Sequence, residues 1–227
     1  DLVFVAPDDP LVLGMADAMQ AEGFMTFGPK KNAAILEGSK VFSKELMQKY
    51  HIPTAEYRVF DKPQEAEAYL KEKNEYPTVI KADGLALGKG VVIAQNEQEA
   101  FDAIASIMED KIFGESGSKV VIEEFLTGPE VSVLSFTDGK TVKPMVSSMD
   151  HKRALDGDQG LNTGGMGTVA PNPYYTPEIA QQCMDTIFLP TIRAMQEEGR
   201  PFTGCLYFGL MLTPKAVSYT HLTLPTI

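Results

Sequence analysis

A glycine-rich loop between two strand-like runs most constrains how this chain can fold. The runs at 77–82 and 91–94 are apolar and rich in β-branched residues. The loop between them carries one lysine and three glycines: Gly84, Gly88, Lys89 and Gly90. Glycine lets the backbone approach a ligand closely, and successive backbone N–H groups can then point at phosphate oxygens. Because the loop leads into a strand and no Ser or Thr follows the lysine, it is neither a dinucleotide fingerprint nor a Walker A loop. The pattern favours a phosphate-covering loop on a β-hairpin.

A lysine stands inside the first of these runs. Lys81 follows Val79 and Ile80 and precedes Ala82. A charged group in the core of a strand is costly unless it is paired, and the phosphate of an anionic ligand would pair it. The alternative is a lysine that extends to solvent from an edge strand beside a flexible surface hairpin.

The apolar run at 120–122 ends in four residues suited to an adenine ring: Glu123, Glu124, Phe125 and Leu126. Such a strand end can offer backbone hydrogen-bonding groups and apolar walls to the ring. Glu130 begins the next strand, where a carboxylate can accept hydrogen bonds from both ribose hydroxyls. The alternative, which these residues favour when each is taken singly, is a solvated pair of glutamates at a strand end.

Residues 148–174 form a long polar stretch without clear periodicity, which in a compact chain is either functional or disordered. Asp150 can hold an amine, Lys152 and Arg153 can neutralise a phosphate or carboxylate, and His151 is a weak candidate for a general base. A later run suits close backbone approach to a small polar ligand: Asn162, Thr163, Gly164, Gly165, Met166 and Gly167. The Asp and Gly residues at 156–160 lack the full calcium-loop pattern.

The remaining pattern predicts an α/β chain. Strand-like runs at 1–6 and 24–27 alternate with two expected helices, one at 10–22 and one that starts after Pro29 and ends near Gly38. This alternation implies a layer of parallel strands covered by helices. We expect further helices at 39–50, 63–73, 97–109 and 177–198. We expect strands at 56–60, 77–82, 91–94, 119–125, 130–137, 141–147 and 203–212.

Composition excludes some classes of function. The net charge of −11 argues against duplex nucleic acid or an anionic membrane as the main partner. No apolar run approaches the ~20 residues of a membrane helix. The two cysteines form no disulfide framework, which is typical of a cytoplasmic protein.

Together these motifs resemble one family, the glycinamide ribonucleotide synthetases of the ATP-grasp superfamily. The family's motifs appear in order over about residues 1–215: Gly38-Ser39-Lys40, 81–90, 123–130, Asp150-His151-Lys152-Arg153 and 162–167. The loop at 81–90 alone indicates only an ATP-grasp enzyme, whereas the last two motifs are far more specific. The resemblance implies an α/β (α+β) ATP-grasp fold. Two antiparallel-sheet lobes, 38–126 and 127–215, would follow the remnant of a Rossmann-like domain at 1–37.

The resemblance also implies an activity in purine biosynthesis. Glycine would take the γ-phosphate of ATP to give glycyl phosphate, and 5-phosphoribosylamine would displace the phosphate to form glycinamide ribonucleotide, with Mg²⁺ or Mn²⁺ beside ATP. Lys40, Lys81 and Lys89 would contact the ATP phosphates, and residues 123–126 and Glu130 would hold the nucleoside. Lys89 and Arg153 are the catalytic candidates. The acceptor sites would be lined by Pro7, Asp8, Asp150, Lys152, Arg153, Asn162, Thr163, Gly164, Gly165 and Met166.

The sequence departs from the family pattern at both ends. It starts inside a strand-like run at Asp1, after the point where the family has a Gly-rich loop for the sugar phosphate. Beyond Lys215 the family continues to a Glu and an Asn that hold Mg²⁺, whereas residues 216–227 match nothing in it. We therefore expect a truncated cytoplasmic monomer without metal ligands of its own, which binds ATP but does not complete the ligation. The alternatives are another ATP-grasp carboxylate–amine ligase or carboxylase, and a nucleotide-binding fragment that is not an enzyme.

Overall fold

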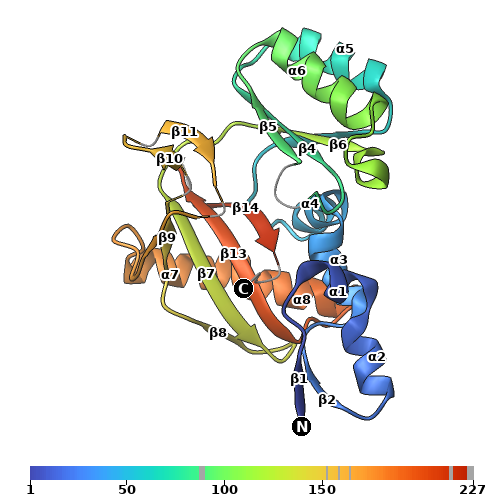
Figure 1. Ribbon diagram of the computed structural model, residues 1–227. Coiled ribbons are helices and arrows are strands. Elements are labelled where there is room, and N and C mark those ends of the chain that lie inside the picture. The colour runs from blue at the N-terminus through green and yellow to red at the C-terminus, as the bar shows by residue number, and fades with distance from the viewer. Residues whose placement is uncertain (87–89, 152, 158, 164, 215–216, 224–227) are drawn as a thin grey trace.

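The structure is a computed structural model that describes residues 1–86, 90–151, 153–157, 159–163, 165–214 and 217–223. It has an N-terminal part and two lobes, each lobe built on a four-stranded antiparallel sheet (Figure 1). Two antiparallel-sheet lobes are what the resemblance to the family implies. Within the described part of the chain, no helix is long and apolar enough to cross a membrane.

The N-terminal part pairs two short strands in parallel, as the strand–helix alternation predicts. β1 (Leu2–Phe4) lies beside β2 (Met25–Phe27), and α1 (Asp8–Leu13) and α2 (Met15–Ala21) connect them. The prediction of one helix over 10–22 is wrong, because Gly14 takes a φ of 100° and ends α1. Glycine adopts this left-handed conformation without the steric cost that a side chain would add. α3 (Lys31–Gly38) then packs against α1.

The first lobe follows α4 (Lys40–Lys49), which Ser39 caps by accepting a hydrogen bond from the backbone of Phe42. The strand order in its sheet is β3 (Tyr57–Phe60), β6 (Val120–Glu124), β4 (Thr78–Ala82) and β5 (Val91–Ala94). Two helices, α5 (Pro63–Lys73) and α6 (Glu97–Ile104), cover one face of this sheet (Figure 1). A π-helical turn at Ala105–Glu109 and a short 3-10 helix at Gly114–Gly117 then lead into β6.

The second lobe is a sheet with the strand order β14 (Val217–Thr223), β13 (Gly204–Leu212), β7 (Glu130–Thr137) and β8 (Val142–Pro144). One continuous helical segment packs against it: α7 (Pro177–Cys183), a π-helical turn (Met184–Phe188) and α8 (Leu189–Glu197). The Phe188 ring lies against the Phe208 ring of β13, with 4.2 Å between centroids.

The polar stretch of the second lobe contains short strands that its sequence does not predict. β9 (Met149–Asp150) pairs with β12 (Thr168–Val169), and β10 (Arg153–Leu155) pairs with β11 (Gln159–Asn162). The strands lie at one end of the second sheet, and β9 contacts β7 (Figure 1).

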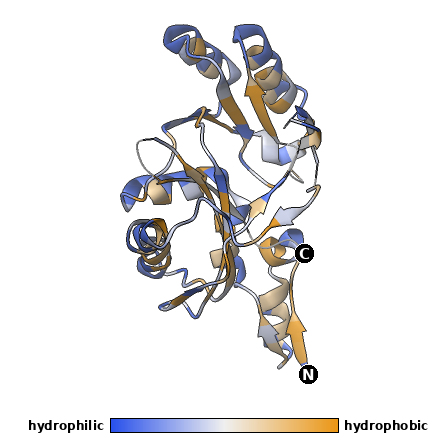
Figure 2. Ribbon diagram, turned by 90° about the vertical axis from the view of Figure 1, so that its left-hand side faces the viewer, coloured by the Kyte–Doolittle hydropathy of each residue, from blue (hydrophilic) through white to orange (hydrophobic). Residues whose placement is uncertain are grey.

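Two separate apolar cores hold the molecule together. The larger core joins the N-terminal part to the second lobe and includes Leu11, Leu36, Leu46 and Phe208. The smaller core lies between the first sheet and its helices and includes Ile80 and Ile104. Figure 2 shows apolar strands inside both sheets and hydrophilic residues on the outer helices. The first lobe therefore has its own core and holds the glycine-rich hairpin β4–β5.

Candidate functional site

Three buried charged side chains meet beside the glycine-rich loop. Glu123 Oε2 accepts a hydrogen bond from Lys81 Nζ at 3.0 Å and lies 3.1 Å from Lys44 Nζ. The exposed fractions are 4% for Glu123, 8% for Lys81 and 3% for Lys44. β4 lies inside its sheet, so the interpretation of Lys81 as a solvent-extended lysine on an edge strand is wrong. The interpretation of Glu123 as a solvated strand-end residue is wrong too, because its side chain points into the protein.

Lys44 is a site residue that the sequence analysis misses. It lies on the buried face of α4, three residues after Val41 and three before Met47. A lysine in that apolar stripe is the signal that identifies it. Its Nζ also donates a hydrogen bond to Thr54 Oγ1 at 2.8 Å. Burial lowers the pKa of Lys44 to about 8, and the Glu123 carboxylate opposes this shift.

Lys40 reaches the base of the loop from the first turn of α4. Its Nζ donates to the carbonyl of Gly84 at 3.0 Å, and its backbone N–H donates to the carbonyl of Asp83 at 2.9 Å. Burial lowers the pKa of Lys40. Asp83 Oδ1 also accepts hydrogen bonds from Ser39 Oγ at 2.9 Å and from the backbone of Val41 at 2.8 Å. The Asp83 side chain, a second residue missed from sequence, therefore joins the loop to the helix.

Two glycines of the loop are packed too closely to carry a side chain. A Cβ at Gly84 would lie 2.5 Å from Ser116 Oγ, and a Cβ at Gly90 would lie 2.6 Å from the Cβ of Ala86. These glycines hold the ends of the loop against the lobe. Gly88 and Lys89 lie outside the described residues, so their predicted phosphate contacts stay predictions.

The predicted nucleoside contacts lie where the chain passes from the first lobe to the second. Glu124 Oε1 accepts a hydrogen bond from the backbone of Glu56 at 3.0 Å. Phe125 is 38% exposed, Leu126 is half-buried, and Glu130, at the start of β7, is exposed. A planar ring could reach this segment, and its contacts with adenine and ribose stay predictions.

The two specific motifs of the polar stretch lie side by side. Met166 N–H donates to the carbonyl of His151 at 2.7 Å, and His151 N–H donates to that of Gly167 at 3.0 Å. A Cβ at Gly165 would lie 3.0 Å from Asp150 Oδ1. Thr163 Oγ1 accepts the backbone N–H of Gly165 at 3.1 Å.

Four further residues predicted for this stretch lie, entirely or with their side chains, outside the described part of the chain. Lys152 and Gly164 lie outside the described residues, and so do the side chains of Arg153 and Asn162. Their predicted contacts with the acceptor molecules stay predictions.

Asp8 is a perturbed carboxylate on the N-terminal part. It begins α1 after the exposed Pro7, and its Oδ1 is buried without a hydrogen-bond partner among the described residues. Burial raises the pKa of Asp8 to about 6, and the neighbouring Asp9 carboxylate adds to the shift. Such a group is a candidate for binding a ligand donor.

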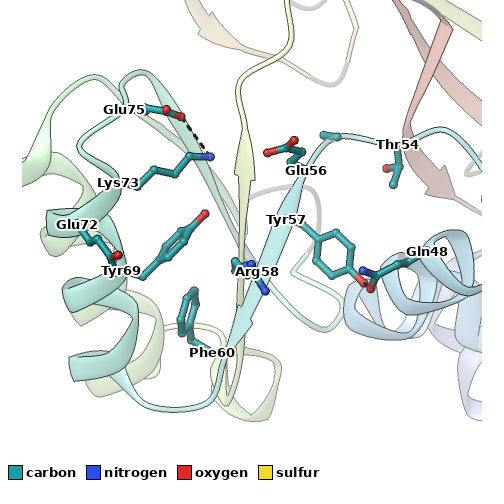
Figure 3. A pocket seen from close by; sticks show the side chains of 11 residues that line it. Gln48, Thr54, Glu56, Tyr57, Arg58, Phe60, Tyr69, Glu72, Lys73 and Glu75 are labelled. Atoms are coloured by element: carbon teal, nitrogen blue, oxygen red, sulfur yellow. Dashed lines mark hydrogen bonds and ion pairs between the residues drawn. The ribbon is translucent and has the colours of Figure 1, made fainter.

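A pocket of about 980 Å³ lies along β3, the edge strand of the first sheet (Figure 3). Within it, the Tyr57 hydroxyl donates to Gln48 at 2.9 Å, and Lys73 pairs with Glu75 at 3.3 Å. Its lining contains none of the residues predicted from sequence: Gln48, Thr54, Ala55, Glu56, Tyr57, Arg58, Phe60, Tyr69, Glu72, Lys73 and Glu75. This pocket therefore does not test the phosphate contacts predicted at 81–90 or the acceptor contacts predicted at 150–167.

The described residues do not form a metal site of the usual kind. Within them, no group of three or more His, Cys, Asp or Glu side chains is placed to hold a metal ion. The lysine cluster at the loop has the opposite character, because ammonium groups attract anions and repel metal cations.

Solved structures share the fold. Phosphoribosylamine–glycine ligase from Thermotoga maritima superposes with a TM-score of 0.81 at 37% identity, over 88% of this chain and 50% of that one. D-alanine–D-alanine ligase from Coxiella burnetii superposes with a TM-score of 0.73 over 98% of this chain and 58% of that one. At 14% identity the second likeness shows the fold alone. The expectation of an ATP-grasp fold is confirmed.

Family models and sequence relatives agree with this fold. The model described as "Phosphoribosylglycinamide synthetase, ATP-grasp (A) domain" matches residues 38–222, and the N-domain model of the same synthetase matches residues 1–37. Phosphoribosylamine–glycine ligase from Pasteurella multocida is 51% identical over 94% of this chain and 49% of its own length. The Clostridium acetobutylicum protein of the same name is 52% identical over 96% of this chain and 52% of its own length. The chain thus spans about half the length of these relatives, and it belongs to the phosphoribosylglycinamide synthetase family.

Proposed function

We propose that this chain forms the ATP-binding part of an enzyme that joins glycine to 5-phosphoribosylamine. The products would be glycinamide ribonucleotide, ADP and phosphate, with glycyl phosphate as the intermediate. The relatives named phosphoribosylamine–glycine ligase support this reaction. The observation that carries the ATP-binding part is the position of Lys40 and Lys81 at the base of the glycine-rich loop, with Lys44 paired to Glu123 beside Lys81.

The lysine cluster fits a triphosphate for a physical reason. Lys40 and Lys81 are held close to the loop, yet their present hydrogen bonds go to the Gly84 carbonyl and to Glu123. For Lys40, a phosphate oxygen is a stronger acceptor than the neutral carbonyl of Gly84, because both donor and acceptor are then charged. Lys89 would add a further positive charge as the loop covers the phosphates. The backbone of residues 124–126 would hold the adenine ring, and Glu130 would hold the ribose.

The acceptor molecules would bind beside the polar stretch. Asp150 and the adjacent backbone at 163–167 would hold glycine, with Lys152 and Arg153 neutralising its carboxylate or the sugar phosphate. Pro7 and Asp8 would contact 5-phosphoribosylamine from the N-terminal part. The protein's contribution is alignment and charge neutralisation, which is the usual basis of phosphoryl transfer.

We propose that ATP binds together with Mg²⁺ or Mn²⁺, which neutralises charge that develops on the phosphates. The described residues do not supply a set of carboxylates for the ion. No protein ligand is therefore assigned to it, and no step is derived through it. We also propose a monomer in the cytoplasm, in keeping with its two free, buried cysteines; light scattering in solution tests the oligomeric state.

Titration calorimetry with ATP and Mg²⁺ tests the proposal. Wild-type protein should bind ATP, and Lys81→Met should weaken binding at least about tenfold through loss of a charged hydrogen bond. Glycine, D-alanine and bicarbonate are then titrated separately onto the ATP-bound protein. Binding of glycine alone supports the glycine ligase, whereas binding of D-alanine or bicarbonate instead would favour a different ATP-grasp ligase or carboxylase.

A further inference from the structure

One carboxylate oxygen pairs with two buried lysine side chains in this structure. Glu123 Oε2 meets both Lys44 Nζ at 3.1 Å and Lys81 Nζ at 3.0 Å. Its other oxygen, Oε1, is buried and accepts no hydrogen bond within the described chain. The two lysines come from different elements: Lys81 belongs to the sheet beneath the loop, and Lys44 belongs to α4.

Lys44 is held in place by more than this carboxylate. Its Nζ donates to Thr54 Oγ1 at 2.8 Å and lies 5.6 Å from the centroid of the Tyr57 ring. These contacts sit on the side of Glu123 that borders the pocket along β3. Lys44 is therefore held on the side of Glu123 that faces the pocket, whereas Lys81 lies in the strand that leads into the glycine-rich loop.

Because two lysines share the Glu123 carboxylate, one of them can move to a ligand without leaving this carboxylate unpaired. If Lys81 were the sole partner of Glu123, its move onto a phosphate would leave a buried carboxylate unpaired, which is strongly unfavourable. Glu123 would then compete with the phosphate for Lys81. Because Lys44 remains on the same oxygen, Lys81 can leave without exposing an unpaired charge.

We propose that Lys44 is a positioning residue for ATP: it neutralises Glu123 and so releases the Lys81 ammonium to a phosphate. The inference rests on the proposed function, because it requires that Lys81 meets a phosphate of the nucleotide. Lys44 itself touches no ligand in this account. Its effect on affinity runs entirely through Glu123, and removal of Glu123 should therefore abolish it.

The test measures ATP affinity by calorimetry with Mg²⁺ present in four variants of the chain. Lys44→Met should weaken ATP binding at least about tenfold, because Glu123 then retains Lys81. Glu123→Gln should bind ATP within about threefold of wild type or more tightly, because no carboxylate competes for Lys81. The double variant Lys44→Met/Glu123→Gln should recover to the same range. Lys49→Met removes an equal charge from an exposed site on the same helix, paired with Glu198, and should leave affinity unchanged.

The outcomes separate the two proposals. If the folded wild-type chain does not bind ATP, the proposed function fails, and this inference fails with it. If wild type binds and Lys44→Met binds equally well, only the inference fails. It also fails if affinity stays low in the double variant, since Lys44 would then act on structure alone. Should Lys44→Met not fold, a tenfold loss of affinity in Glu123→Gln alone contradicts the inference.

Discussion

Replacement of Asp8 by asparagine is expected to stabilise the chain at neutral pH and not in acid. The carboxylate is half-buried, and burial together with Asp9 raises its pKa from 3.8 to about 6. The folded chain therefore binds the Asp8 proton more tightly than the unfolded chain does. Stability is lost as the pH rises through the interval between these two pKa values, and the loss persists above it.

The size of the effect follows from the shift. At 1.36 kcal/mol per pKa unit, the change from 3.8 to about 6 corresponds to at most about 3 kcal/mol. Solvent screens a partly exposed group, so we expect about 1–2 kcal/mol. Asparagine keeps the shape of the side chain and removes the charge. Loss of an acidic residue from the first turn of α1 offsets a few tenths of a kcal/mol of the gain.

Urea unfolding of wild type and Asp8→Asn at pH 7.5 and at pH 4 measures this effect. The variant should gain about 1–2 kcal/mol in the free energy of unfolding at pH 7.5, and most of the gain should vanish at pH 4. Asp9→Asn is the matched control, because it removes an exposed carboxylate from the same turn and should change stability by less than about 0.5 kcal/mol. An equally stable or less stable Asp8→Asn protein at pH 7.5, or a gain of the same size at pH 4, would refute the reasoning.

Two further substitutions test the packing of the second lobe by urea unfolding. Gly128→Ala should destabilise the chain by at least about 1 kcal/mol. The reason is that Gly128 has a φ of 149°, and a Cβ there would overlap the carbonyl oxygen of Leu212. An unchanged free energy of unfolding would contradict this, because it would show that the backbone at Gly128 and Leu212 moves apart without cost. Phe188→Ala should cost about 3–5 kcal/mol, because the ring is fully buried against Phe208; a loss below about 1 kcal/mol would contradict this packing.

Much of the secondary structure was predictable because its signals are local. Pro63 at the start and the lysines near the end bound the helix over 63–73, and the structure begins and ends it at the same residues. The strands at 91–94 and 130–137 also match, since glycine or turn residues flank their apolar runs. Ser39 caps its helix as its position predicts.

The incorrect predictions of secondary structure concern segments whose conformation depends on contacts beyond their immediate neighbours in sequence. A glycine inside an α-helix costs only about 1 kcal/mol relative to alanine. The sequence alone therefore does not show that the helix ends at Gly14. In the structure, Gly14 packs against Lys31 and separates two helices. Among the short strands within 148–174, β9 and β12 pair across a long separation in sequence, as Asp150 does with Thr168. β10 and β11 form a local hairpin with an irregular register, which a pattern of alternating side chains does not reveal.

The motifs of the candidate site were predictable from the sequence, whereas most of the hydrogen bonds and ion pairs that join their side chains were not. The loop, Lys40, Lys81 and Glu123 stand out as residue types, and the structure does bring Lys81 and Glu123 together. Lys44 and Asp83 act through partners more than 40 positions away, as in the hydrogen bond from Val41 N–H to Asp83. No local pattern specifies such partners.

A crystal structure of the chain with a non-hydrolysable ATP analogue tests the central claim most directly. The account predicts phosphate oxygens within hydrogen-bonding distance of Lys40 Nζ and Lys81 Nζ, with Lys44 still on Glu123 and the adenine ring beside Phe125. A nucleotide bound instead in the pocket along β3, with Lys81 still paired to Glu123, would contradict it.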